Sequence, residues 1–101
     1  DLHLAPTLGS PPRKLGELDT QSRDTKPYAR LISEFSPFTA MYNITGQPSA
    51  SIPMHWTEDG LPVGVMLTAR FGDEVTLLRA AAQLEEVNPW AGRKPPNWAG
   101  T

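Results

Sequence analysis

The side chains that could do chemistry are hydroxyl and amine groups whose spacing does not form a catalytic set. A serine hydroxyl becomes nucleophilic near neutral pH only beside a base, and its oxyanion needs preorganised donors. None of the serines lies in a glycine-rich turn, and the lysines lie in loops or at a helix start. They are Ser10, Ser22, Ser33, Ser36, Ser49, Ser51, Lys14, Lys26 and Lys94. Ser49-Ala50-Ser51 sits in a strand-like run. We therefore predict that no residue of this chain is catalytic.

Metal and thiol chemistry find no support in the sequence. The histidines are His3 and His55, and neither has Cys, His or carboxylate neighbours at the spacing of a metal site. Cysteine is absent, which excludes disulfides and thiol catalysis. Glu58-Asp59 is typical of a hairpin turn rather than of a catalytic carboxylate pair. The sequence predicts no metal and no cofactor.

Length and charge exclude several classes of partner. The 101 residues allow one domain at most, and their net charge is −2. The basic pairs Arg13-Lys14 and Arg93-Lys94 lie in proline-rich loops and form no stripe, so we expect no nucleic acid. No apolar run approaches the ~20 residues of a membrane span, so we expect no membrane partner. A cytoplasmic location is the default expectation. Because the chain lacks an initiator Met and opens inside an apparent strand, we expect it to be a fragment of a longer protein.

Residues 43–69 predict a β-hairpin. The strand-like runs are Ser49 to Met54 and Leu61 to Ala69, and Asp59-Gly60 between them is a turn signal because glycine tolerates positive φ. In the first run Ala50, Ile52 and Met54 share one face. The second run is almost wholly apolar, which is typical of a strand covered on both faces.

Two helical stretches flank the hairpin. Residues 24–42 are predicted to be helical, with a cap at Asp24 or Thr25, and their apolar positions recur at the spacing of one buried face: Tyr28, Leu31, Ile32 and Phe35. The most aromatic group of the chain overlaps the end of this stretch and is expected to pack between helix and sheet, or alternatively to form an apolar wall of a substrate pocket; it comprises Phe35, Phe38, Met41 and Tyr42. A helix over 73–88 is expected to begin at Asp73, to end at Asn88-Pro89, and to bury Leu77, Ala81, Leu84 and Val87. Residues 1–22 are expected to form a strand and loop, and residues 89–101 a tail.

The hairpin stretch also carries a family resemblance. It reads Asn-x-Thr-Gly-x-Pro-small-x-Ser-x-Pro over residues 43–53, then Gly-Leu-Pro-x-Gly over residues 60–64. This text resembles the C-terminal signature of the amidase signature family, and the flanking stretches agree with it. Within the family it is most similar to bacterial amidases of the 6-aminohexanoate-cyclic-dimer hydrolase kind. The resemblance implies an α/β fold, with short strands of a mixed sheet, a β-hairpin and covering helices.

The same resemblance implies a function for the parent protein. Family members cleave carboxamide C–N bonds, in linear or cyclic amides, with a serine nucleophile, a second serine in a cis peptide and a lysine base. Those groups lie in a Gly-Gly-Ser-Ser-Gly-like stretch that these residues lack. The chain is therefore expected to supply scaffold and one pocket wall, to be inactive alone, and to have as partners a small-molecule amide substrate and the rest of the amidase chain.

Two serines are the candidate substrate contacts. In some family members the residues seven and ten positions before the motif Asn contact the substrate, and these positions correspond here to Ser36 and Ser33. They are one helical turn apart, so both could face one cleft. The alternative is two solvated serines at a helix end. Because Ser36 is neutral, the resemblance argues against a charged amine as the substrate.

A second hypothesis comes from another class of protein. The chain could be a free-standing, non-catalytic α/β binding or structural module derived from the same fold. A cooperatively melting 101-residue protein would favour that hypothesis. Self-association would instead indicate an uncovered sheet edge or apolar face.

Overall fold

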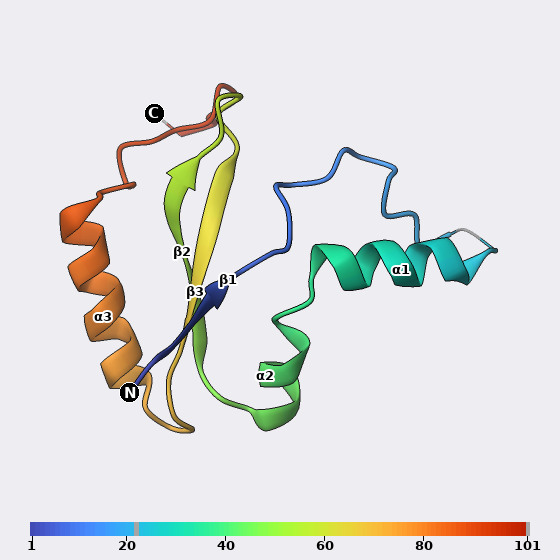
Figure 1. Ribbon diagram of the computed structural model, residues 1–101. Coiled ribbons are helices and arrows are strands. Elements are labelled where there is room, and N and C mark those ends of the chain that lie inside the picture. The colour runs from blue at the N-terminus through green and yellow to red at the C-terminus, as the bar shows by residue number, and fades with distance from the viewer. Residues whose placement is uncertain (22, 101) are drawn as a thin grey trace.

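The strands form one antiparallel sheet, and a helix covers one of its faces (Figure 1). The computed structural model describes residues 1–21 and 23–100. The order along the chain is β1 (His3–Pro6), α1 (Thr25–Phe35), α2 (Ala40–Thr45), β2 (Ser49–Trp56), β3 (Pro62–Thr68) and α3 (Glu74–Val87). In the sheet, β3 lies between β1 and β2. Every pairing among these three strands is antiparallel. The short strands, the β-hairpin and the covering helix agree with the predicted α/β class.

The β2–β3 hairpin turns where the sequence predicts it. Gly60 has a φ of +82°, a value that residues with a Cβ rarely adopt. Its N–H donates to the Thr57 carbonyl at 2.9 Å, and the Thr57 N–H donates to the Leu61 carbonyl at 2.9 Å. The local residue types therefore suffice to specify this turn.

A bulge interrupts β2 at a point that the sequence does not reveal. Ser49 pairs with Thr68 and the register continues to Pro53 opposite Gly64, after which it shifts by one residue. Proline has no N–H to donate, and such residues are confined to edge strands and bulges. β2 therefore continues through the irregularity to Trp56, two residues beyond the predicted end at Met54.

The core lies between α3 and one face of the sheet. Ile52, Leu67 and Ala69 are buried there, and Leu77 is the buried residue that α3 contributes. Ala50 and Met54 pack against this cluster, as the alternation along β2 predicts. The expected burial of Val87 is wrong, because its side chain is 82% exposed. At ~100° per residue, Val87 is rotated by roughly 80° from Leu77, so it leaves the buried side of the helix.

Helix α1 does not pack on the sheet. Its N-cap is Asp24, whose carboxylate accepts a hydrogen bond from the Lys26 N–H at 3.1 Å, as predicted. No residue of α1 is fully buried, and Figure 1 shows the helix standing apart from the sheet. The predicted apolar face of α1 is therefore only half-buried, whereas Tyr42, from the aromatic group expected to pack on the sheet, is buried. Instead, the Gly9 N–H in the β1–α1 loop donates to the Phe35 carbonyl at 2.8 Å and joins that loop to the end of α1.

Helix α2 extends further than the sequence suggests. It runs through Asn43 to Thr45, so the expected boundary between a helical stretch ending at 42 and a hairpin stretch beginning at 43 falls inside it. Gly46 ends the helix with a φ of +72°, and its N–H donates to the Tyr42 carbonyl at 2.9 Å. The glycine thus has the terminating role that its position predicts.

The tail after α3 returns to the hairpin (Figure 1). The Asn88 side-chain amide donates to the Met54 carbonyl at 2.9 Å, next to the bulge. Trp90 packs against the core cluster, and the Arg93 guanidinium lies 3.9 Å from the centroid of the Trp56 ring. A cation over an indole face is a favourable contact. These contacts hold the tail against β2.

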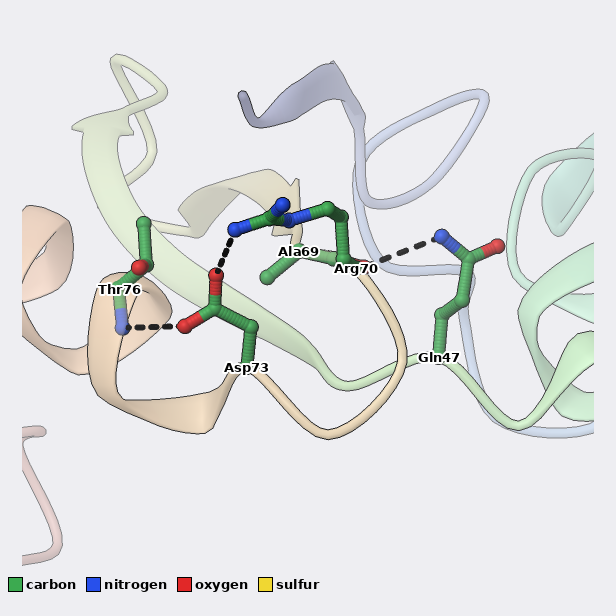
Figure 2. A network of polar contacts seen from close by, with 5 residues as sticks. All are labelled: Gln47, Ala69, Arg70, Asp73 and Thr76. Carbon is green, nitrogen blue, oxygen red and sulfur yellow. Dashed lines mark hydrogen bonds and ion pairs between the residues drawn. The ribbon is translucent and has the colours of Figure 1, made fainter.

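The Asp73 carboxylate gives α3 a pH-dependent cap. It accepts a hydrogen bond from the Thr76 N–H at 3.3 Å and pairs with the Arg70 guanidinium at 3.3 Å (Figure 2). Hydrogen bonds from the Thr76 side chain and backbone, with a smaller contribution from Arg70, hold the pKa of Asp73 below its ordinary value. The cap therefore stabilises the fold above about pH 4, and this contribution is lost as pH falls through the lowered pKa.

We expect Asp73→Asn to weaken this pH dependence, because asparagine still accepts the cap bond but does not titrate in this range. The urea midpoint of the unmodified chain should fall more between pH ~7 and pH ~3 than that of the variant. Asp59→Asn in the hairpin turn removes one carboxylate away from the helix and should keep the original slope. If the urea midpoint of Asp73→Asn fell with pH as steeply as that of the unmodified chain, the Asp73 cap would not be the source of the pH dependence.

Candidate functional site

A hollow of about 320 Å³ lies on the polar face of the sheet, beside α2. The residues around it carry no formal charge and are mostly hydroxyl and carboxamide side chains. They are Thr7, Thr39, Tyr42, Asn43, Gln47, Ser49, Ala50, Ser51 and Met66. The hollow can therefore offer hydrogen-bond donors and acceptors without a counter-ion.

The strand register brings the hydroxyl groups to this face. Side chains alternate along β2, so Ser49 and Ser51 face away from the core that Ile52 enters. Ser49 lies opposite Thr68 in the neighbouring strand, and their hydroxyl oxygens are 2.8 Å apart. This pair satisfies the hydroxyl of Thr68, which is only 2% exposed.

Gly64 lets two outer segments meet across the central strand. The hydroxyl oxygens of Thr7 and Ser51 lie 2.7 Å apart, although Thr7 follows β1 and Ser51 is on β2. A Cβ at Gly64 would lie 2.5 Å from the Ser51 oxygen and 2.8 Å from the Thr7 oxygen. Such distances are too short for a side chain, so the hydroxyl pair requires glycine at this position of β3.

Helix α2 supplies the opposite wall. Tyr42 is 7% exposed, and its hydroxyl is hydrogen-bonded to Nδ1 of His3, which ties the helix to β1. Thr39 and Asn43 are four residues apart, so they lie on the same side of the helical turn, and both line the hollow. The Asn43 carboxamide can donate through its NH₂ and accept through its oxygen.

Gln47 links the hollow to the start of α3. Its Nε2 donates to the Ala69 carbonyl at 3.1 Å, and Figure 2 shows the side chain reaching to that carbonyl beside the Arg70–Asp73 pair. The segment between α2 and β2 is thereby held against the segment between β3 and α3. One wall of the hollow is therefore fixed to the same turn that caps α3.

The two predicted substrate contacts, Ser33 and Ser36, have different surroundings in the structure. Ser33 is exposed, and its hydroxyl donates to the Arg30 carbonyl at 2.8 Å in the preceding turn. Ser36 ends α1, and its hydroxyl oxygen lies 2.8 Å from that of Thr39. Neither serine lines the hollow itself, but Ser36 reaches it through Thr39.

The strand serines and the possible metal ligands were also located in the structure. The Ser49 hydroxyl is hydrogen-bonded to that of Thr68, and the Ser51 hydroxyl to that of Thr7. Over residues 1–21 and 23–100, no three His, Cys, Asp or Glu side chains come together in a way that could hold a metal ion. In the same ranges, none of the helices has the length and apolar character needed to cross a bilayer.

Sequence reasoning missed the residues that form the hollow. Thr39, Asn43 and Gln47 lie in and beside α2, whereas Thr7 and the strand residues come from elsewhere in the chain, and only the tertiary structure brings them together. The available signal was the alternation of Ser49 and Ser51 with Ala50 and Ile52, which indicates a polar face opposite the core. A polar sheet face flanked by the Asn43 motif would have located the site.

Comparison with known proteins gives consistent matches. The family model described as Amidase matches residues 1–78. A 6-aminohexanoate-cyclic-dimer hydrolase from Pseudomonas sp. (strain NK87) is 37% identical over 101 residues, covering 94% of this chain and 20% of the relative. The protein of the same name from Paenarthrobacter ureafaciens is 36% identical, with the same coverage of both chains.

Solved structures agree with these sequence matches. The structure of 6-aminohexanoate cyclic dimer hydrolase matches with a TM-score of 0.81 at 35% identity. The match covers 95% of this chain and 21% of the hydrolase chain. The same hydrolase complexed with substrate matches to the same degree. The chain thus spans about a fifth of the length of the relatives that it matches.

Proposed function

Because this chain belongs to the Amidase family, we propose that it forms the C-terminal scaffold and one substrate-pocket wall of a serine amidohydrolase that cleaves carboxamide C–N bonds. The observation that carries the proposal is the uncharged hollow beside Asn43, whose lining residues all fall within the matched residues 1–78. A neutral amide is recognised by donors and acceptors placed without a counter-ion. A charged amine would be a poorer fit to the same wall.

The residues of this wall would bind and orient the amide. The Asn43 carboxamide could accept a hydrogen bond from a substrate N–H or donate one to a substrate carbonyl, and Thr39, the N-cap of the same helix, lies one turn away. Holding the amide in a fixed orientation lowers the entropic cost of nucleophilic attack. By resemblance to the family, the serine nucleophile, the cis-peptide serine and the lysine base would lie outside these residues.

We place Ser36 and Ser33 at the rim of the same wall. Support for Ser36 is its 2.8 Å contact with Thr39, which lines the hollow. Substrate contact by Ser33 has weaker support, since its hydroxyl already donates a hydrogen bond to the Arg30 carbonyl. Substrate contact by Ser33 would require that hydroxyl to exchange partners.

A chimera tests the proposal. Residues 1–101 would replace the matching fifth of the Pseudomonas relative, and turnover of 6-aminohexanoate cyclic dimer would be assayed beside the isolated chain. We expect turnover by the chimera and none by the chain alone. In the chimera, Ser36→Ala should raise KM about fivefold with little change in kcat, as loss of a hydrogen bond of ~1 kcal/mol predicts. Ser33→Ala should have a smaller effect.

The control is Thr20→Ala, which changes an exposed loop hydroxyl away from the hollow and should leave KM unchanged. A soluble chimera without turnover would contradict the amidase proposal. Turnover by the isolated chain would contradict the scaffold role. An unchanged KM in Ser36→Ala would remove that serine from the substrate wall.

A further inference from the structure

The beginning of α3 exposes large apolar side chains that the core does not use. Val75 and Leu78 lie one turn apart on the helix and are 59% and 66% exposed, and Phe71, in the turn just before α3, is 78% exposed. We call these three residues the α3 outer patch. Leu77 fills the core beneath the same helix, so α3 carries apolar side chains on two sides. A helix apolar on more than one side is typical of a helix covered on more than one side.

The exposed surface of α3 changes character after Leu78. Beyond it the large exposed side chains are mostly polar or charged, namely Arg79, Gln83, Glu85 and Glu86, with Val87 as the exception at the last residue of the helix. The match to the Amidase family model also ends at residue 78. Apart from the exposed Glu74 at its first residue, the beginning of α3 therefore has the composition of a covered surface, and most of the remainder that of a solvated one.

We propose that the α3 outer patch docks against amidase polypeptide from outside the fifth that this chain represents. This inference rests on the proposed function, and it assigns one surface of the chain to that partner. The matched relatives are about five times as long as the matched stretch, so an amidase has ample polypeptide to cover the patch. A second copy of the chain fits less well. Three side chains fall far short of the ~800 Å² per partner that a stable interface buries.

The patch adjoins the helix that carries Asn43. A Cβ at Gly46 would lie 3.3 Å from the Phe71 ring, so the ring sits beside the residue that ends α2. Polypeptide that covers Phe71 would therefore also approach the end of α2. Docking at the patch would hold both α3 and one wall of the hollow in place.

Thiol labelling of the cysteine-free chain tests the docking. Val75→Cys places a probe in the patch, and Arg79→Cys places a matched probe one turn further along α3. Both would be treated with a charged maleimide in the isolated chain and in the Pseudomonas chimera, with the labelled peptide identified by mass spectrometry. We expect similar labelling rates in the isolated chain. In the chimera, labelling of Val75→Cys should slow by tenfold or more while that of Arg79→Cys stays unchanged.

A substitution keeps the test independent of labelling. Val75→Lys should leave the melting temperature of the isolated chain nearly unchanged, since exposed substitutions usually cost within ~0.5 kcal/mol, and should lower that of the chimera. Equal labelling of both cysteines in an active chimera would overturn the docking and leave the proposed function standing. Protection of Val75→Cys in an inactive chimera would support the docking and contradict the proposed function. An insoluble chimera, or a dimer of the isolated chain that Val75→Lys dissociates, would also overturn the docking.

Discussion

Replacing Leu77 with alanine is expected to destabilise this chain by about 2–5 kcal/mol. Leu77 is 4% exposed and is the buried residue by which α3 joins Ile52, Leu67 and Ala69 in the core. The loss is large because the total stability of a domain is only about 5–15 kcal/mol. With a urea m-value of roughly 1–3 kcal/mol/M, the unfolding midpoint should fall by at least about 0.7 M.

The neighbouring leucine provides a matched control. Leu78 is in the same helix and loses the same atoms on substitution, but its side chain is 66% exposed in the isolated chain. Leu78→Ala should therefore shift the free energy of unfolding by no more than ~0.5 kcal/mol. Equal effects of the two substitutions would show that α3 does not pack on the sheet as described.

Substituting Gly9 with alanine is expected to separate α1 from the β1–α1 loop. A Cβ at this position would overlap the Glu34 carbonyl oxygen and lie 3.3 Å from Cδ of Pro37. The overlap is with backbone, so rotation of a side chain cannot relieve it. The Gly9 N–H also donates to the Phe35 carbonyl at 2.8 Å, so moving the loop away stretches this bond. Strain of this kind costs about 1–3 kcal/mol.

Hydrogen exchange locates this effect. The amides of α1 should exchange faster in Gly9→Ala, because the helix buries no side chain fully and an 11-residue helix is marginal without tertiary contacts. The amides of β3 should be little affected, since they lie in the sheet away from this contact. Gly92→Ala is the control, as a Cβ there meets no atom within 4 Å. Unchanged exchange in α1 would contradict the proposed anchoring of the helix by the loop.

The family of the chain could be predicted from its sequence because the signature residues are contiguous. The resemblance of residues 43–64 to an amidase motif is confirmed by the family match and by the relatives. Substrate contact by Ser36 and Ser33 remains a prediction, since it depends on how this wall meets the remainder of an amidase. The positions of these hydroxyl groups at the end of a helix do not predict which polypeptide or ligand lies opposite them.

Taken alone, the sequence determined the features that depend on a few neighbouring residues. The caps at Asp24 and Asp73 and the reversal at Gly60 follow from local hydrogen bonding and permitted φ values. Only the tertiary structure decided which apolar side chains are buried, as the contrast between Leu77 and Val87 shows. It also decided the bulge after Pro53, the separation of α1 from the sheet and the meeting of Thr7 with Ser51. These features depend on contacts between segments far apart in the chain, whose free energies no local pattern records.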